Sequence, residues 1–156
     1  TALLLNKNMG FRAHYYGPFS EEVENGVDEL IGAGFVDVKR NIFGVDAKHG
    51  FEVKRDDFSL TEEGDKLALS LVEKEENNYK KIEAFVKSLQ NIGDPDYLNL
   101  SVAAKTYFIL HKESKPLTEN EIKAKAKEIG WIVTTQNIDK AVEILTELKL
   151  AKRTSA

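Results

Sequence analysis

The clearest hydrophobic pattern of the chain lies in its last forty residues, where apolar positions recur with helical spacing in two short runs. In the first run, Ile122, Ala126 and Ile129 are three or four residues apart, and Gly130 follows them. The second run has the same spacing, at Ile138, Val142, Leu145 and Leu148. Such spacing places side chains on one face of a helix. The pattern therefore predicts two amphipathic helices separated by a tight turn.

Both helices have start signals. Thr118 stands three residues before Glu121, which is the spacing of a capping box, and Thr134-Thr135 opens the second helix. The second helix runs into Leu150-Ala151-Lys152-Arg153, which we predict to be a basic strand. Two short helices around a tight turn form the arrangement that places a helix in a DNA groove.

The first half of the chain predicts a helix followed by two strands. Ser20 suits an N-cap and Gly34 a helix end. The apolar stripe between them consists of Val23, Val27, Leu30 and Ile31. We predict that a strand begins at residues 35–38, that residues 39–50 form a loop, and that residues 51–60 return as the partner strand.

A long helical pattern then covers residues 61–90, as one helix or as two separated near Asn77-Asn78. The segment Ile92-Gly93-Asp94-Pro95-Asp96 is the clearest break in the chain, because glycine ends helices while Asp and Pro suit the start of the next. A helix over residues 97–112 follows. We therefore predict two domains, residues 1–93 and 94–156.

These patterns resemble the winged-helix superfamily. The run from Leu117 through the second C-terminal helix to Arg153 is similar to the core of MarR-like transcriptional regulators. In the first half, Leu30–Val36 and Leu60–Gly64 follow turn patterns of winged-helix proteins. The turn Tyr16-Gly17-Pro18-Phe19-Ser20 resembles that of Panacea-type antitoxin domains and related uncharacterised archaeal proteins. The resemblance implies a mainly α fold with short β-hairpin wings, arranged as two winged-helix-like modules in tandem.

The chain departs from this pattern at the ends of both modules. Too little sequence precedes Ser20 for two complete helices, so the front of the first module is missing or remodelled. The second module ends at Ala156 without a returning wing strand. Because there is no initiator methionine, we expect the chain to begin inside a longer natural protein.

Composition narrows the class of protein. Apolar residues make up 42% and charged residues 31%, as in soluble globular proteins, and there is no cysteine. The absence of cysteine excludes disulfides and thiol catalysis, and it suits a cytoplasmic protein. The net charge of −4 argues against a protein that coats nucleic acid. Residues 98–156 nevertheless carry ten basic and seven acidic residues, so the second half is the better candidate for contact with DNA.

The candidate DNA-binding residues begin at the second C-terminal helix. They are Thr134, Thr135, Gln136, Asn137 and Lys140. Gln and Asn amides pair bidentately with adenine, and the lysines of the preceding helix, together with Lys152 and Arg153, suit the phosphate backbone. Glu143 and Glu147 discourage deep insertion of the rest of the helix. The alternative is that Thr135 only caps the helix, that the amides are solvated, and that the fold serves protein contact.

The first module is a weaker candidate. Its helix after Ser20 carries acidic side chains and neither Lys nor Arg, so DNA would repel it. The acidic residues are Glu21, Glu22, Glu24, Asp28 and Glu29. The following wing contains Lys39, Arg40 and Lys48, which could grip phosphate or a minor groove. An ordinary solvated hairpin is an equally good interpretation.

Other chemistry has little support in the sequence. The three histidines are widely separated, the paired aspartates are sequence neighbours that do not converge, and no nucleotide-binding glycine motif is present. We therefore expect no metal, no cofactor and no enzymatic activity, and we interpret Trp131 as a core residue. The sequence favours a DNA-binding transcriptional regulator with double-stranded DNA as its partner. We expect it to act as a homodimer through the long helix of residues 61–90. The alternative is a protein-interaction adaptor or antitoxin-like module, whose acidic first domain binds a protein and which does not bind DNA.

Overall fold

The computed structural model describes residues 8–14, 17–45, 52–93 and 95–153. Within these ranges the chain forms six helices and two antiparallel sheets of two strands each. The prediction of a mainly helical protein with short β-hairpins is therefore confirmed. Across the same ranges, no helix is long and apolar enough to cross a membrane.

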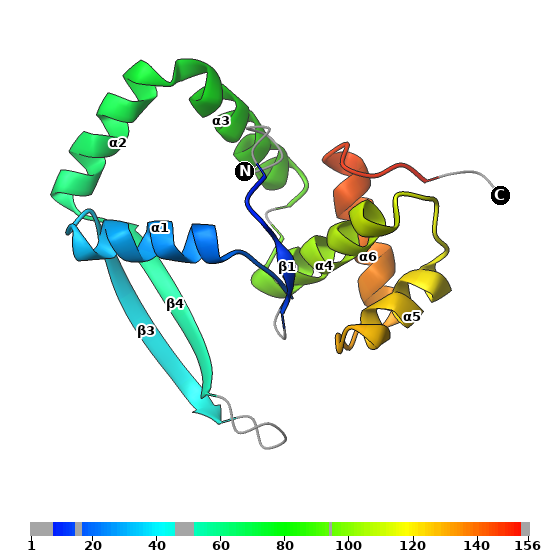
Figure 1. Cartoon of the computed structure of the whole chain (residues 1–156). Helices are drawn as coiled ribbons and strands as arrows, with labels where there is room; N and C mark the ends of the chain where they lie inside the picture. The colour runs from blue at the N-terminus through cyan, green and yellow to red at the C-terminus, as the bar shows by residue number, and fades with distance from the viewer. Residues whose placement is uncertain (1–7, 15–16, 46–51, 94, 154–156) are drawn as a thin grey trace. The chain divides into compact units, whose positions relative to one another are not determined.

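The chain packs as two compact units, whose elements are labelled in Figure 1. The terminal unit consists of the residues up to Ser20 and those from Lys80 onward, and the central unit is Glu21–Tyr79. This grouping differs from the predicted domains 1–93 and 94–156, because the N-terminal hairpin packs on the C-terminal helices.

Three helices form the core of the terminal unit. They are α4 (Tyr97–Glu113), α5 (Glu119–Glu128) and α6 (Thr135–Glu147), close to the predicted positions. One buried cluster joins all three helices and the turn before α6; it consists of Ile109, Ile122, Ala126, Trp131, Val133 and Ile138. A second cluster joins α4 to α6 and consists of Ala103, Ala141, Ile144 and Leu145. Of the apolar positions that the spacing predicted, Ile122, Ala126, Ile138 and Leu145 are buried and Ile129, Val142 and Leu148 are half-buried, whereas the buried Ile144 was overlooked.

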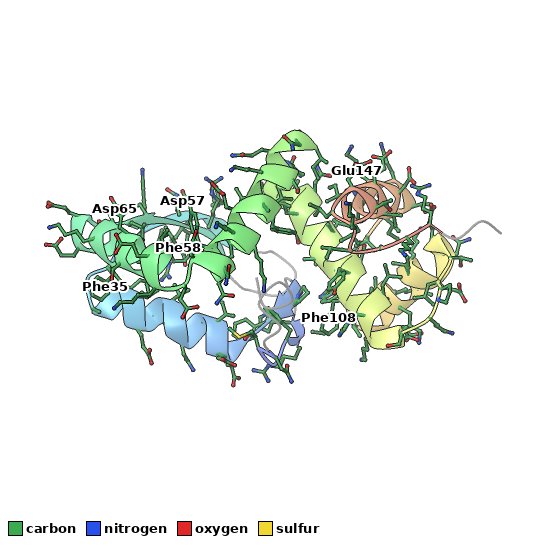
Figure 2. The ribbon with its side chains drawn as sticks, turned by 90° about the horizontal axis from the view of Figure 1, so that it is seen from above. Phe35, Asp57, Phe58, Asp65, Phe108 and Glu147 are labelled. Atoms are coloured by element: carbon green, nitrogen blue, oxygen red, sulfur yellow. The ribbon has the colours of Figure 1, made fainter. Side chains whose placement is uncertain are left out.

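Trp131 connects the N-terminal hairpin to this core. The hairpin consists of β1 (Arg12–His14) and β2 (Gly17–Phe19), and β2 contacts α4. The indole Nε1 of Trp131 donates a hydrogen bond of 2.6 Å to the carbonyl oxygen of His14. The ring of Phe108, labelled in Figure 2, lies edge-on to the indole at 5.7 Å between centroids. Trp131 is thus the core residue that the sequence predicted, and it binds a strand more than a hundred residues away.

The central unit has the predicted order of helix, two strands and helix. It contains α1 (Glu21–Gly32), β3 (Val36–Val45), β4 (Glu52–Leu60) and α2 (Glu62–Lys74). The predicted loop at residues 39–50 is wrong for residues 39–45, which continue β3 and, apart from Phe43, pair with β4. Gly44, with φ of 132°, lies at a bulge in β3, so this glycine marks an irregular strand and not a loop. Residues 46–51 lie outside the described ranges.

The helical stretch after β4 is two helices. α2 ends at Lys74, and α3 (Glu76–Asn91) follows after Glu75, slightly before the predicted break at Asn77-Asn78. The backbone N–H of Glu75 still donates to the carbonyl oxygen of Leu71. A single long helix over residues 61–90 is therefore not formed, and α3 spans the boundary between the two units.

The predicted basic strand at residues 150–153 is also wrong. This segment follows α6 without strand structure. The backbone N–H groups of Leu150 and Ala151 both donate to the carbonyl oxygen of Leu145, so they complete the end of α6. Lys149, with φ of 58°, makes the left-handed turn that allows this.

Candidate nucleic-acid interface

The position of α6 is fixed by one fully apolar face. Ile138, Ala141, Ile144 and Leu145 are buried against α4 and α5, at spacings of three and four residues. The helix begins at a capping box, in which the hydroxyl of Thr134 accepts a hydrogen bond from the backbone N–H of Asn137. These contacts hold the first turn of α6 in one orientation relative to α5.

The opposite face of the first turn of α6 is exposed. The side chains of Thr134, Thr135, Gln136, Asn137 and Lys140 all face solvent. The terminal unit thus brings together the five residues that the sequence singled out here. Hydroxyl, amide and ammonium groups provide both donors and acceptors for base edges and phosphates.

Asn137 has a structural task within this group. Its Oδ1 accepts hydrogen bonds from the backbone N–H of Thr134 at 3.3 Å and from the Thr134 hydroxyl at 2.7 Å. Bidentate pairing with adenine requires the same oxygen to accept from the base. Gln136 makes no hydrogen bond among those described, so it is the better candidate for base contact.

Two of the candidate basic side chains form ion pairs with carboxylates of α6. Lys140 Nζ lies 3.1 Å from Glu143, and Arg153 lies 2.6 Å from Asp139. Both pairs are about half exposed to solvent, where an ion pair contributes between zero and about 1 kcal/mol. A phosphate group could therefore replace either carboxylate at small cost.

The lysines of α5 lie beside this surface. Lys123 and Lys127 are exposed and line a hollow of about 410 Å³ between α5 and the turn before α6. Lys125 lies near Glu113 and Glu128, and its hydrogen bond to Glu128 raises the pKa of its ammonium group. Lys152, on the segment after α6, is exposed.

Sequence reasoning overlooked Ile132. It is 90% exposed, although Trp131 and Val133 on either side are buried. An extended segment sends alternate side chains to opposite faces, so two buried neighbours force the side chain between them outward. The alternation Trp-Ile-Val was the available signal. An exposed isoleucine beside the first turn of α6 suits the methyl group of thymine or a deoxyribose.

The basic residues predicted for the first wing belong to the β3–β4 hairpin of the central unit, and their charges are balanced locally. Arg40 makes two hydrogen bonds to Asp56, of 2.8 and 2.9 Å, and Lys39 lies opposite Asp57 in the hairpin register. The described strands β3 and β4 contain four basic and four acidic residues. Lys48 lies outside the described residues. These strands therefore present no excess of positive charge to a phosphate backbone.

Other candidate groups have structural roles. Asp96 caps α4, because its side chain accepts from the backbone N–H of Asn99 at 2.8 Å. Asp56 and Asp57 bind neighbouring side chains of the hairpin. In the described part of the chain, no three His, Cys, Asp or Glu residues are grouped so that they could hold a metal ion.

No family model, curated protein or solved structure matches the chain.

Proposed function

We propose that the protein is a DNA-binding transcriptional regulator with two winged-helix-like modules, and that it reads duplex DNA with the first turn of α6. The two-sided character of α6 supports this most directly. Its apolar face is buried, while the polar side chains of its first turn are exposed together. A helix held rigidly by one face can present the other to a groove.

The charges around α6 support an approach through its N-terminal end. Lys123 and Lys127 on α5 lie on the same side of the terminal unit as the turn that precedes α6. Glu143 and Glu147 are exposed farther along α6, and Glu147 is labelled in Figure 2. Contact is therefore favourable at the first turn and repulsive at the last, which suits a recognition helix that enters the groove by its N-terminal end.

The proposal is tested by selecting duplexes from a random pool at two salt concentrations. Specific base contacts persist when salt is raised, whereas purely electrostatic binding weakens steeply. We expect a sequence motif to be enriched at both concentrations. Absence of any enriched motif would contradict the proposal.

Gln136→Ala provides the first residue test. We expect it to weaken binding to the selected duplex by about 1–3 kcal/mol, because it removes a base contact while the fold is kept. Gln90→Ala is the matched control, since Gln90 is an exposed glutamine on α3. Fluorescence anisotropy measures both affinities, and circular dichroism checks the helix content. Equal affinities of the two variants would remove Gln136 from the interface.

A second candidate function is a protein-interaction module that does not bind DNA. The observation that favours it is α1, on which Glu21, Glu22, Glu24, Asp28 and Glu29 are all exposed and no basic residue is present. Such a helix suits a basic protein surface. This function would be favoured if a protein co-purified with the chain in stoichiometric amount and no salt-sensitive DNA binding was found. The double substitution Glu22→Lys with Asp28→Lys should then abolish the co-purification.

A further inference from the structure

Two side chains around the start of α6 present different chemistry to the same solvent region. Asn137 is in the first turn of α6, and Ile132 lies two residues before the N-cap Thr134; both are exposed. Thr134 connects them, because it follows Ile132 closely in the extended segment and binds the side chain of Asn137. The two side chains are therefore considered together.

The amide of Asn137 is left with hydrogen-bond donors only. Its Oδ1 accepts from the backbone N–H of Thr134 at 3.3 Å and from the Thr134 hydroxyl at 2.7 Å. An amide oxygen has two lone pairs, so both are occupied. The Nδ2 group makes no hydrogen bond among those described, and it carries two N–H donors. Asn137 therefore offers donors to a ligand and no acceptor.

Ile132 supplies an apolar surface next to these donors. It is 90% exposed, whereas Trp131 is 2% and Val133 8% exposed, so the buried side chains on both sides hold it outward. Ile132 also lines the hollow that Lys123 and Lys127 border. Ammonium groups suit the phosphates of a DNA strand, and the bases of the same strand lie beside those phosphates. The position of Ile132 thus suits an apolar group on a base.

The major-groove edges of the four bases differ in how well they match this pair. Thymine presents the O4 acceptor and the 5-methyl group, so a donor amide and an apolar side chain match it at both points. Cytosine presents an N4 donor, which would face the donors of Asn137. Adenine has an N6 donor beside N7, and guanine has acceptors without a methyl group. A deoxyribose would use Ile132 alone. Thymine is therefore the partner that uses both side chains.

We propose that Asn137 and Ile132 read a thymine in the major groove, with Nδ2 of Asn137 donating to O4 and Ile132 packing on the 5-methyl group. The inference rests on the proposed function and names the base that one part of the α6 surface recognises. It also gives the capping box a second role, because Thr134 fixes the amide with its donors turned away from the cap. Gln136 remains the residue for an adenine contact.

Replacement of thymine by deoxyuridine tests the isoleucine contact, because it removes only the 5-methyl group. Each thymine of the selected duplex is replaced in turn, and affinities are measured by fluorescence anisotropy. We expect a thymine position at which replacement weakens wild-type binding by about fourfold, the effect of one buried methyl group, and leaves the affinity of Ile132→Ala unchanged. Ile42→Ala is the matched control, since Ile42 is a 60% exposed isoleucine of the central unit and its variant should keep the fourfold effect.

Asn137→Asp tests the amide contact while the cap is kept. A carboxylate accepts the same hydrogen bonds from Thr134 but has no N–H, and it can accept from the N4 donor of cytosine. At the thymine position found with deoxyuridine, the ratio of affinities for thymine over cytosine should fall by roughly tenfold or more. Asn120→Asp is the matched control: it adds the same charge at an exposed position of α5 and should keep the wild-type ratio. Urea unfolding checks that both variants are folded.

The possible outcomes separate this inference from the proposed function. If no duplex motif is enriched at either salt concentration, the proposed function fails and the thymine contact fails with it. If a motif is enriched but the wild type tolerates deoxyuridine at every thymine, or Asn137→Asp keeps the preference for thymine, DNA binding stands and the thymine contact is overturned. A deoxyuridine effect that persists in Ile132→Ala also overturns it, because the methyl group would then contact another residue.

Discussion

At the scale of single residues, Gly64 lies where the start of α2 meets the turn after α1. Thr61 binds that turn twice, through its backbone N–H to the carbonyl oxygen of Phe35 at 3.1 Å and through its hydroxyl to that of Gly34 at 2.7 Å. A Cβ atom on Gly64 would lie 2.0 Å from the Phe35 carbonyl oxygen. Phe35 and Asp65, which flank this contact, are labelled in Figure 2. The close approach of two backbones therefore requires glycine at position 64.

We predict that Gly64→Ala destabilises the protein by about 1–3 kcal/mol, because backbone and not a flexible side chain must move. Gly26→Ala is the control. Gly26 lies inside α1, where an added Cβ would meet no neighbouring group within 4 Å, so alanine should stabilise the helix by roughly 0.5–1 kcal/mol. Urea unfolding monitored by circular dichroism measures both changes. Two shifts of the same sign would contradict the assigned contact.

The sequence predicted these residues but not their contacts. The patterns Leu30–Val36 and Leu60–Gly64 both appeared as turn signals, yet nothing in either pattern shows that one turn binds the other. Their meeting depends on closure of a hairpin between them, which is a long-range event. Asn137 was similarly recognised as polar and exposed, while its capping role was overlooked because Asn is an unusual third residue for a capping box.

At the scale of elements, helix starts were the most predictable features. The N-cap Thr118 was identified from local residue types, because a cap needs only neighbours within one helical turn. The β3–β4 hairpin was harder to predict from the sequence. Gly44 and the run Lys39-Arg40-Asn41 have the composition of a loop, and only pairing with β4 makes them strand. The strand predicted after α6 is not formed, because the backbone N–H groups of this segment bind the end of the helix instead of another strand.

The capping box of α5 predicts a pH dependence of stability. Hydrogen bonds from the backbone N–H and the hydroxyl of Thr118 lower the pKa of Glu121. A carboxyl group whose pKa is lower in the folded state stabilises the fold above its unfolded pKa, and this contribution is lost as the pH falls through the folded pKa. We therefore expect the unfolding midpoint of the wild type to fall more than that of Glu121→Gln below about pH 4.3, the ordinary glutamate pKa.

Thr118→Ala supplies the control for this pH effect. Thr118→Ala removes the hydroxyl hydrogen bond but keeps the backbone N–H donor, so the difference in acid response between glutamate and glutamine at position 121 should become smaller without vanishing. Urea midpoints measured from neutral pH downward for the four proteins of this double-mutant cycle give the comparison. If the difference between Glu121 and glutamine kept the same pH dependence in the Thr118→Ala background, the Thr118 hydroxyl would not contribute to it.

At the scale of the whole molecule, charge separates with the packing units. Residues 21–79 contain sixteen acidic and seven basic residues, so the central unit has a net charge of −9. Because the whole chain has a net charge of −4, the rest of the chain has a net charge of +5. This separation is sharper than that between the sequence halves, because residues 1–20, which carry +2, group with the terminal unit, while residues 80–97 have no net charge. The excess positive charge therefore lies in the unit that holds α6.

This distribution predicts how DNA binding should respond to salt. Each phosphate neutralised by a lysine contributes about 0.9 to the slope of log affinity against log salt concentration, so Lys123→Gln with Lys127→Gln should lower the magnitude of the slope by roughly 2. The loss should be similar for selected and random duplexes, because phosphate contacts carry no sequence information. Lys66→Gln is the control: this lysine lies on α2 in the acidic unit, next to Glu62 and Glu63, and should leave the slope unchanged. Gln136→Ala, in contrast, should reduce affinity for the selected duplex alone. If Lys66→Gln lowered the salt slope as much as the Lys123 and Lys127 substitutions, the DNA would contact a different surface from the one around α6.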